Sequence, residues 1–263
     1  MDYSSYYDFQ WQQTGGKQHP YVAEKTNIIL DIIPPDVRTI IDVGCGDGTI
    51  TNVLAERYST AGIDTSREGL KNLSKKAQPV FGSADCLPFK SNCVDLSLSS
   101  ELLEHLPEEV FLGAISEMKR ISRKHILITV PNNEHLRRRY AKCMACGFEF
   151  HVYCHLRTFN LNKLERYFSG YTIAHSSLCG APDEKSFDLI YYLRNRLANQ
   201  YCIDTISTLC PHCGTVISPL KSNLPQRLVG HSLFLLQNWL NVLLLRKPEP
   251  DWLVVLLEKT QER

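Results

Sequence analysis

The chain has 263 residues, 43% of them hydrophobic, so it can bury a full core, and this length favours one large domain with an elaboration over two equal domains. Its formal net charge of +1 excludes an overall electrostatic field that would hold the protein on nucleic acid or on an anionic membrane. The leader MDYSSYYDFQWQQTGGKQHP is polar and aromatic rather than charged and then apolar, which indicates a cytoplasmic protein whose ten cysteines are thiols or metal ligands rather than disulfides.

The first 131 residues alternate between helical and extended patterns. Residues 20–34 carry apolar side chains at helical spacing and stop at a proline pair, whereas residues 38–43 are a short run rich in branched side chains. Further helices are expected at 49–58, 67–77 and 107–121, and further strands at 60–64, 79–85, 92–99 and 124–131. Strands that alternate with helices imply parallel, right-handed βαβ units with helices on both faces. The sequence therefore predicts a doubly wound α/β sheet.

Beyond this region the pattern is less regular. A short helix is expected at 135–140, strands at 171–178 and 252–259, and helices near 185–200 and 225–245. The most apolar stretch, 228–245, is long enough to span a membrane but contains His231, Gln237 and Asn238. We therefore expect a buried helix here, with a helix that lies in a membrane interface as the alternative.

Three glycines at alternate positions join the first predicted strand to the next helix, in 41-IDVGCGDG-48. Gly44 permits a tight turn out of the strand, Gly46 lets the backbone approach a ligand, and Gly48 permits close packing of the helix that follows. In a doubly wound sheet, ligands bind at the carboxyl ends of the strands, where these glycines lie. A tight turn with no ligand is the alternative, because a G-x-G-x-G pattern alone is weak evidence.

Two aspartates stand at the ends of the next two predicted strands. Asp64 lies where such a site places a carboxylate to accept hydrogen bonds from ribose hydroxyls. Asp85, in 82-GSADCLPF-89, can meet the exocyclic amine of a purine whose ring lies between apolar side chains. Each aspartate alone could be a loop residue or a helix cap. Fitting groups at three consecutive strand ends favour a real binding site.

The motifs IDVGCGDG, GID, SADCLPF and VDLSLSSELLEHLP, in this order, resemble those of class I S-adenosylmethionine-dependent methyltransferases of the small-molecule "type 11" kind, over residues 38–131. A dinucleotide-dependent oxidoreductase is the main rival, but its G-x-G-x-x-G fingerprint is absent from the glycine loop. The resemblance implies a seven-stranded Rossmann-like sheet whose last strand is antiparallel, for which residues 252–259 are the candidate.

The resemblance also implies which residues hold the cofactor, S-adenosylmethionine. The glycine loop, with Asp42, Gly44, Cys45, Gly46 and Gly48, would lie beside the methionine part. Asp64 would hold the ribose, with Thr65 as a further cofactor-binding residue, and Asp85 and Cys86 would hold the adenine. Ser100 and Glu101 would border the methyl group.

Methyl transfer from this cofactor needs the acceptor held near an already activated methyl group, plus a base if the acceptor is a hydroxyl. His105, in 101-ELLEHLP-107, is the candidate base because imidazole titrates near neutrality, and a packed or capping histidine is the alternative. Glu101 is a second catalytic candidate, which could orient the acceptor or face the cationic sulfonium. The leader residues Tyr6, Tyr7 and Trp11 could close over the pocket as substrate-binding rings, or could pack as an ordinary amino-terminal arm.

Two C-x-x-C-G sequences, Cys143 to Gly147 and Cys210 to Gly214, lie outside these motifs. Each has the form of a zinc knuckle, in which a tight turn directs two thiolates at one metal. We predict that Cys143, Cys146, Cys210 and Cys213 bind one structural Zn²⁺ in a tetrahedral site. The alternatives are four free thiols, a redox pair, or a ligand set that includes His151, Cys154, His155 or His212.

The segment 143–168 resembles a pattern in some bacterial type 11 methyltransferases, in which a knuckle is followed by a histidine pair and then H-x-R-x-F. The comparison implies that His155 and Arg157 lie at the substrate mouth. Arg157 could hold a carboxylate or phosphate there, or could tie the segment to the core. The three arginines at 137–139 are expected on a solvated face, with phosphate binding as the alternative.

Six segments are expected along the chain. They are an aromatic arm and first helix on the lid side (1–37), an S-adenosylmethionine-binding core (38–135), the first knuckle with the H-x-R-x-F segment (136–168), a sixth strand (169–180), a helical insertion with the second knuckle (181–248), and a last strand with the C-terminus (249–263).

The near-neutral charge and the apolar insertion favour a methyltransferase that acts on a small molecule or a glycan, most simply by O-methylation. An RNA or protein methyltransferase that holds its substrate with the zinc region and the arginines is one alternative. A non-catalytic scaffold that binds S-adenosylmethionine is the other.

Overall fold

The computed structural model describes residues 21–183, 187–201, 209–217, 222–244 and 247–260. The chain divides into two compact units of three segments each. The sheet unit comprises Thr14–Asn132, Phe159–Ala181 and Pro250–Arg263, and the cysteine unit comprises Met1–Gln13, Asn133–Thr158 and Pro182–Glu249. The predicted lid residues Tyr6, Tyr7 and Trp11 lie outside the described residues.

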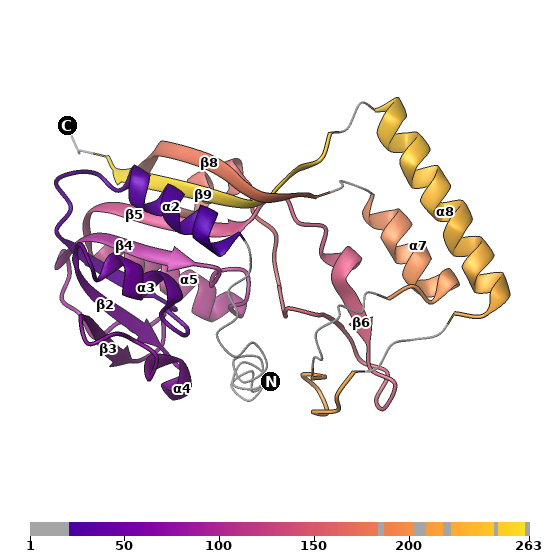
Figure 1. Ribbon diagram of the computed structural model, residues 1–263, viewed down its shortest axis with the longest axis horizontal. Coiled ribbons are helices and arrows are strands. Elements are labelled where there is room, and N and C mark those ends of the chain that lie inside the picture. Colours follow the sequence, from indigo (N-terminus) through magenta and orange to yellow (C-terminus); the bar gives the residue numbers. More distant parts are fainter. Residues whose placement is uncertain (1–20, 184–186, 202–208, 218–221, 245–246, 261–263) are drawn as a thin grey trace. The chain divides into compact units, whose positions relative to one another are not determined.

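Seven strands form one sheet in the order β3-β2-β1-β4-β5-β9-β8 (Figure 1). The strands are β1 (Thr39–Val43), β2 (Ser59–Asp64), β3 (Ala77–Phe81), β4 (Val94–Ser100), β5 (Ser122–Pro131), β8 (Tyr171–Asp183) and β9 (Glu249–Lys259). The pairs β1–β2, β2–β3, β1–β4 and β4–β5 are parallel, whereas β9 runs antiparallel to β5. The strand order reverses between β1 and β4, so the ligand site of such a sheet belongs at their carboxyl ends. The predicted doubly wound sheet with an antiparallel last strand is confirmed.

Helices cover both faces of this sheet. They are α2 (Val22–Ile32), α3 (Thr49–Leu54), α4 (Arg67–Leu70), α5 (Glu108–Ile121) and α6 (Leu161–Tyr167). Ile41 and Val43 of β1 belong to the apolar cluster that contains Phe111 of α5, whereas Ile40 belongs to the cluster that contains Ile29 of α2. Successive side chains of a strand point to opposite faces, so β1 is anchored on both sides and its carboxyl end is held firmly.

Two helices are shorter than the sequence predicted, because α3 ends at Leu54 and α4 at Leu70. Asn52 accounts for the end of α4. Its side-chain amide donates to the Asn72 carbonyl (3.0 Å), and its side-chain oxygen accepts from the Ser74 amide (2.7 Å). These bonds satisfy backbone groups that a longer helix would have paired, and Asn and Ser favour such local bonds over helix.

The cysteine unit is built from short elements and two longer helices. They are η1 (Leu136–Arg139), β6 (Tyr140–Lys142), β7 (Glu149–His151), α7 (Asp188–Ala198) and α8 (Leu224–Leu243). Strands β6 and β7 form an antiparallel hairpin with Ala141 opposite Phe150, and α7 packs along α8. A capping box starts α8, because the Asn223 side chain accepts from the Gln226 amide and the Gln226 side chain accepts from the Asn223 amide.

The expectation of a buried helix at 228–245 was wrong. In α8 only Gly230 and Gln237 are buried, and apolar side chains such as Leu228 (62% exposed) and Val242 (75% exposed) face outward. Length and apolar content indicate that a helix needs an apolar environment, but they do not say whether its own chain provides one. Among the described helices, none combines the length and apolar content that crossing a membrane requires.

Candidate active site and cysteine cluster

The glycine loop joins β1 to α3 and adopts a backbone that only glycine enters readily. Gly44, Gly46 and Gly48 have φ values of 77°, 55° and 77°, all in the left-handed region. Space is also limited, because a Cβ at position 44 would lie 2.7 Å from the Leu102 side chain and one at position 48 would lie 2.9 Å from Leu73. The loop at the carboxyl end of β1 therefore has no side chains at these three positions. The sequence predicted such a loop, because it lets a ligand approach the backbone closely.

Asp64, at the end of β2, fixes the shape of this loop. One carboxylate oxygen accepts from the Gly46 amide (2.8 Å) and the other accepts from the Ser66 amide (2.7 Å). The Asp64 carboxylate is thus held at the carboxyl end of β2, next to the glycine loop. The sequence predicted the ligand-binding role of Asp64 but not this supporting one. Thr65 follows in an exposed position.

Asp42 is a buried carboxylate with one unmet hydrogen-bonding oxygen. It is 2% exposed, and one oxygen accepts from the Thr51 hydroxyl (2.6 Å). The other oxygen, Oδ1, has no hydrogen-bond partner among the residues that the structure describes. Burial raises the pKa of Asp42 to about 7, and the nearby Asp64 carboxylate adds to the shift. Because buried polar atoms are normally paired, this oxygen suits a cationic or hydrogen-donating ligand, such as the methionine part of S-adenosylmethionine.

The predicted adenine residues lie in the turn that follows β3. Asp85 and Cys86 are both exposed, and the Ser83 hydroxyl pairs with the Asp85 carboxylate. Phe81 stands beside Asp64 in the β2–β3 register and is 52% exposed, with the Arg67 guanidinium 4.0 Å from its ring. The sequence analysis missed Phe81, although an aromatic residue at the end of a strand next to two site aspartates was a usable signal.

Glu101 is held in a strained and charge-compensated position directly after β4. Its φ is 52°, which is uncommon for a residue with a side chain. The carboxylate lies 3.2 Å from the ammonium of Lys25, which is itself 3% exposed, and it accepts from the Thr129 hydroxyl (3.0 Å). The Ser100 hydroxyl lies 2.8 Å from the same Thr129 hydroxyl. The structure therefore brings Ser100 and Glu101 into one hydrogen-bonded group, with Lys25 as a partner that the sequence analysis did not identify.

His105, the candidate base, lies in the turn between β4 and α5. Its side chain is 17% exposed, and its Nε2 lies 3.9 Å from a carboxylate oxygen of Glu104, which is fully buried. The His105 amide donates to the Leu102 carbonyl (3.0 Å), which closes the turn. The turn therefore places a buried carboxylate beside the imidazole of the candidate base.

The four cysteines of the two C-x-x-C-G sequences converge within the cysteine unit. Sγ of Cys143 lies 3.6 Å from that of Cys213, and Sγ of Cys146 lies 3.7 Å from that of Cys210. All four sulfur atoms are within 4.8 Å of one another. A tetrahedron of Zn–S bonds of about 2.3 Å places sulfur atoms about 3.8 Å apart. The cluster therefore has the dimensions of a four-thiolate zinc site.

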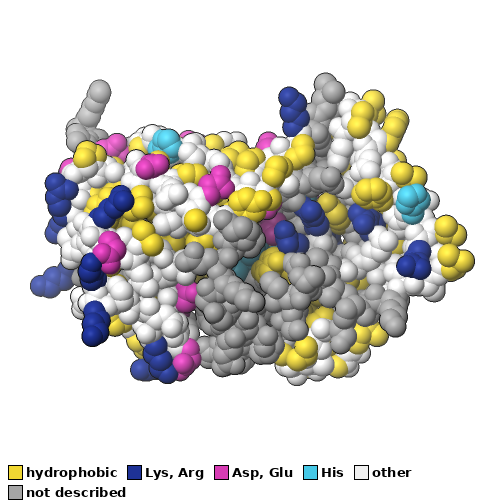
Figure 2. All heavy atoms as spheres, viewed as in Figure 1, with side chains coloured by type: hydrophobic (Ala, Val, Ile, Leu, Met, Phe, Trp, Pro, Cys, Tyr) yellow, Lys and Arg dark blue, Asp and Glu magenta, His cyan; other side chains and the backbone are white. Residues whose placement is uncertain are grey.

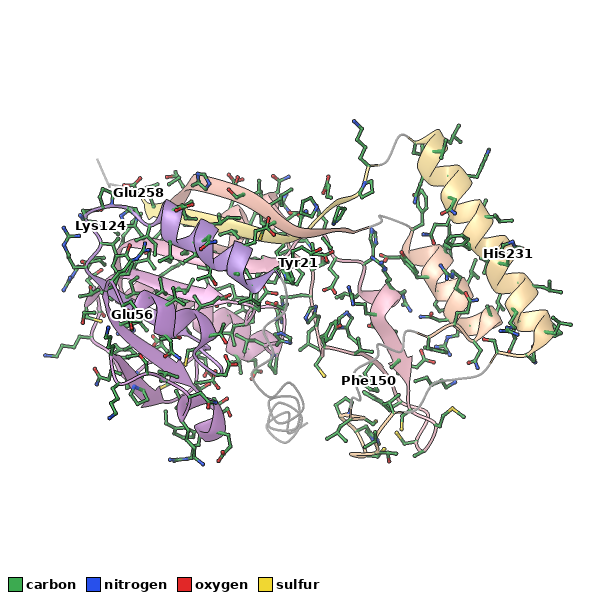
Figure 3. All side chains as sticks on the ribbon, in the orientation of Figure 1. Tyr21, Glu56, Lys124, Phe150, His231 and Glu258 are labelled. Carbon is green, nitrogen blue, oxygen red and sulfur yellow. The ribbon has the colours of Figure 1, made fainter. Side chains whose placement is uncertain are left out.

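The two cysteine turns share one backbone geometry. The Gly147 amide donates to the Cys143 carbonyl (2.9 Å), and the Gly214 amide donates to the Cys210 carbonyl (2.8 Å). Both glycines have positive φ, 75° and 71°, with open space around them. Figure 3 labels Phe150 in the adjoining hairpin, which packs with the buried Cys143 and Cys210 in a small apolar cluster. The sequence thus encodes the same C-x-x-C-G turn twice.

The histidines weighed as alternative ligands have other contacts. His212 stacks on Phe148, with ring centroids 5.3 Å apart, and His151 and His155 both face the Glu134 carboxylate, at 3.3 Å and 2.5 Å. Nδ1 of His151 accepts from the amides of Tyr153 and His155. We call Glu134, His151 and His155 the Glu134 relay; their ligand atoms lie within 4.8 Å of one another, which is also close enough to hold a metal ion.

In the Glu134 relay, the two histidines determine the charge of the Glu134 carboxylate. Burial by itself would raise the pKa of Glu134, but hydrogen bonds from His151 and His155 outweigh burial and lower it below its usual range. The Glu134 carboxylate contacts Nδ1 of His155 and so orients the His155 ring. Cys154, between the two histidines, is 4% exposed.

The predicted arginines have different surroundings. Arg137 is exposed and lies over the Tyr192 ring (5.0 Å), and Arg139 is half-buried and lies over the Tyr153 ring (5.3 Å), so two of the three arginines also contact aromatic faces. Arg157 is half-buried. These stacked arginines stabilise the cysteine unit through their contacts.

Comparison with known proteins agrees with this geometry. Residues 41–128 match the family model of the methyltransferase domain. An uncharacterized protein of Methanocaldococcus jannaschii is 32% identical over 99 residues, which are 37% of this chain and 42% of that protein. Trans-aconitate 2-methyltransferase of Streptomyces avermitilis is 33% identical over 89 residues, 30% of this chain and 33% of that enzyme. The match thus spans less than half the length of either curated relative.

Solved structures extend the likeness to the whole sheet. A crystal structure of an S-adenosylmethionine-dependent methyltransferase from Archaeoglobus fulgidus superposes with a TM-score of 0.56 at 17% identity, and covers 97% of this chain and 99% of that one. At this identity the likeness concerns the fold. Residues 41–128 are thus similar to a methyltransferase domain, and the seven-stranded sheet has the Rossmann-like fold of S-adenosylmethionine-dependent methyltransferases.

Proposed function

We propose that this protein transfers a methyl group from S-adenosylmethionine to a hydroxyl of a small molecule or glycan. The observation that carries the proposal is the unmet oxygen of Asp42, buried beside a glycine loop that Asp64 holds open at the switch point of the sheet. Oδ1 of Asp42 is a buried acceptor without a partner in the described part of the chain, and the glycine loop beside it has no side chains at its three glycines. A ligand that carries hydrogen-bond donors would satisfy this oxygen and could approach the loop closely.

Each part of the cofactor has a candidate partner. The glycine loop and Asp42 would bind its methionine part, Asp64 its ribose, and Asp85 with Cys86 its adenine. Phe81 is an additional candidate, because its exposed ring at the end of β3 can stack on a purine. When bound, the cofactor supplies an activated methyl group, so the protein's own residues need to hold the acceptor, exclude water and accept one proton.

The proton acceptor in this proposal is His105, whose imidazole lies beside the buried Glu104 carboxylate. Glu101 is assigned a different role, because its carboxylate is already engaged by the Lys25 ammonium and the Thr129 hydroxyl. Its negative charge instead favours the cationic methyl donor. His155 and Arg157 of the cysteine unit are proposed acceptor-binding residues, and the ring of His155 is already oriented by Glu134.

The cysteine cluster is proposed to hold one structural zinc ion. Four thiolates fill a tetrahedral coordination shell and leave no open position for substrate, so the metal would contribute stability rather than catalysis. The support is the set of sulfur separations and the repeated knuckle geometry described above.

The decisive experiment for the methyl-transfer proposal is transfer of labelled methyl groups from S-adenosylmethionine into host extract, with the products separated into small molecules, glycans, RNA and protein. Label in small molecules or glycans supports the proposal, whereas label in RNA or protein selects a macromolecular acceptor. If cofactor binding is confirmed by calorimetry but no fraction gains label above an Asp42→Asn control, the scaffold alternative replaces it.

A further inference from the structure

A helix of a water-soluble domain usually packs its apolar face on the protein and exposes its polar face. Helix α8 exposes many apolar side chains and packs a polar residue, Gln237, against α7. The face packed against α7 is polar. Gln237 is 2% exposed and its side-chain oxygen accepts from Arg194 (3.3 Å), whose guanidinium also donates to Gln200 (2.9 Å). Gly230 lies so close to this group that a Cβ there would be 2.2 Å from the Gln200 side chain. The contacts that hold α8 in place therefore include buried hydrogen bonds and a close glycine contact.

The opposite face of α8 is apolar and exposed. Leu228, Leu235, Trp239 and Val242 are 62%, 54%, 60% and 75% exposed. Their spacings of seven, four and three residues place them on one side of the helix, and Leu224 and Leu243 extend the same surface. Figure 2 shows apolar side chains gathered over this part of the molecule. Monomeric proteins rarely leave a continuous apolar surface of this length in water, which indicates an apolar occupant.

The charges around α8 indicate which occupant fits. Between residues 205 and 248 the sequence has four basic residues, Lys221, Arg227, Arg246 and Lys247, and no acidic one. Arg227 in the first turn and Lys247 beyond the last are both exposed. A second copy of the chain would place these like charges near one another and supply no acid from this segment to neutralise them. An anionic lipid surface supplies both the apolar layer and the negative charge.

We propose that α8 lies in the plane of an anionic lipid bilayer, with Leu228, Leu235, Trp239 and Val242 among the acyl chains and with Arg227 and Lys247 at the headgroups. A helix of 20 residues is about 30 Å long, and its polar face already rests on α7, so only the apolar face needs to enter the membrane. This inference does not depend on the proposed methyl transfer. It gives the cysteine unit a role of its own, as the part that brings the protein to a membrane surface.

The test uses the full-length protein and vesicles of phosphatidylcholine alone or mixed with phosphatidylglycerol, with co-sedimentation as the readout. We expect binding to the mixed vesicles that weakens as salt rises. The double variant Leu235→Gln, Trp239→Gln should reduce this binding by roughly tenfold or more, because two inserted side chains are lost. The matched control is Leu112→Gln, which changes an equally exposed leucine (51%) on α5 and should bind like the wild type.

Three outcomes would overturn the proposal. One is absence of binding to both kinds of vesicle by protein whose circular dichroism and S-adenosylmethionine affinity are intact. Another is a protein dimer in light scattering that the double variant dissociates, which would assign the apolar face to a second copy. Equal loss of binding in the double variant and in Leu112→Gln would also refute a specific role for α8.

Discussion

Replacing Cys146 with serine tests the cysteine cluster most directly. The metal would link Cys146 to Cys210 across a separation of 64 residues, so zinc acts as a cross-link that closes a loop of that length. Loop-closure entropy for a cross-link of this span is worth about 4 kcal/mol at 25 °C. Because serine is a poor zinc ligand, we expect the Cys146→Ser protein to lose its metal and about this much stability in the cysteine unit.

Two measurements on the same samples check this prediction. Elemental analysis of the wild-type protein should give one zinc per chain, and that of Cys146→Ser should give much less. Chemical denaturation followed by near-ultraviolet circular dichroism should show the loss of stability, while the sheet unit, which contains none of the four cysteines, should keep its affinity for S-adenosylmethionine. The matched control is Cys86→Ser, an exposed cysteine outside the cluster, which should retain zinc.

Specific results would refute the reasoning. A wild-type protein that contains no zinc after purification without chelators would remove the metal from the cluster. A Cys146→Ser protein that keeps one equivalent of zinc with unchanged stability would show that other ligands hold the metal. In that case His212, the exposed histidine inside the second knuckle, would be the next residue to change.

Three further predictions concern the sheet unit. Asp64→Ala should weaken S-adenosylmethionine binding by at least about 1 to 3 kcal/mol, because the ribose loses an acceptor and the Gly46 amide loses its partner; calorimetry that gives an unchanged affinity would remove Asp64 from the site. The pKa of Asp42 is raised to about 7 in the folded protein, so the cofactor-free protein binds one more proton than the unfolded chain between pH 4 and pH 7 and should become less stable across that window as pH rises, by up to about 4 kcal/mol. Asp42→Asn should flatten this part of the stability profile, and an identical slope in both proteins would assign the titration elsewhere. His105→Ala should slow turnover at least tenfold while cofactor affinity stays the same, in accord with general-base catalysis; a variant with full activity would show that another group accepts the proton.

Much of the geometry of the candidate cofactor site could be predicted from the sequence, because its requirements are local. Positive φ at Gly44 and Gly48 demands glycine at those positions, and the helix–strand period places Asp64 and Asp85 at the ends of successive strands. The two cysteine knuckles are equally local, since each needs only two cysteines and a glycine within five residues. The fold class followed from the same alternation of strands and helices, and the antiparallel β9 agrees with what the resemblance implied.

Other features depend on residues that are far apart in the chain, and no local pattern specifies them. The Lys25–Glu101 ion pair joins a helix before β1 to the end of β4, and the Glu134 relay joins the start of one loop to a histidine pair on another. Tertiary structure also decided which face of α8 is exposed. The apolar run specified a helix that needs an apolar environment. The hydrogen bond between Gln237 and Arg194 of α7 leaves the apolar face of α8 directed outward. Local sequence therefore determined the backbone geometry of the cofactor loop and the knuckles, whereas packing between distant segments determined which charges are neutralised and which surfaces remain exposed, because those free energies arise only when the segments meet.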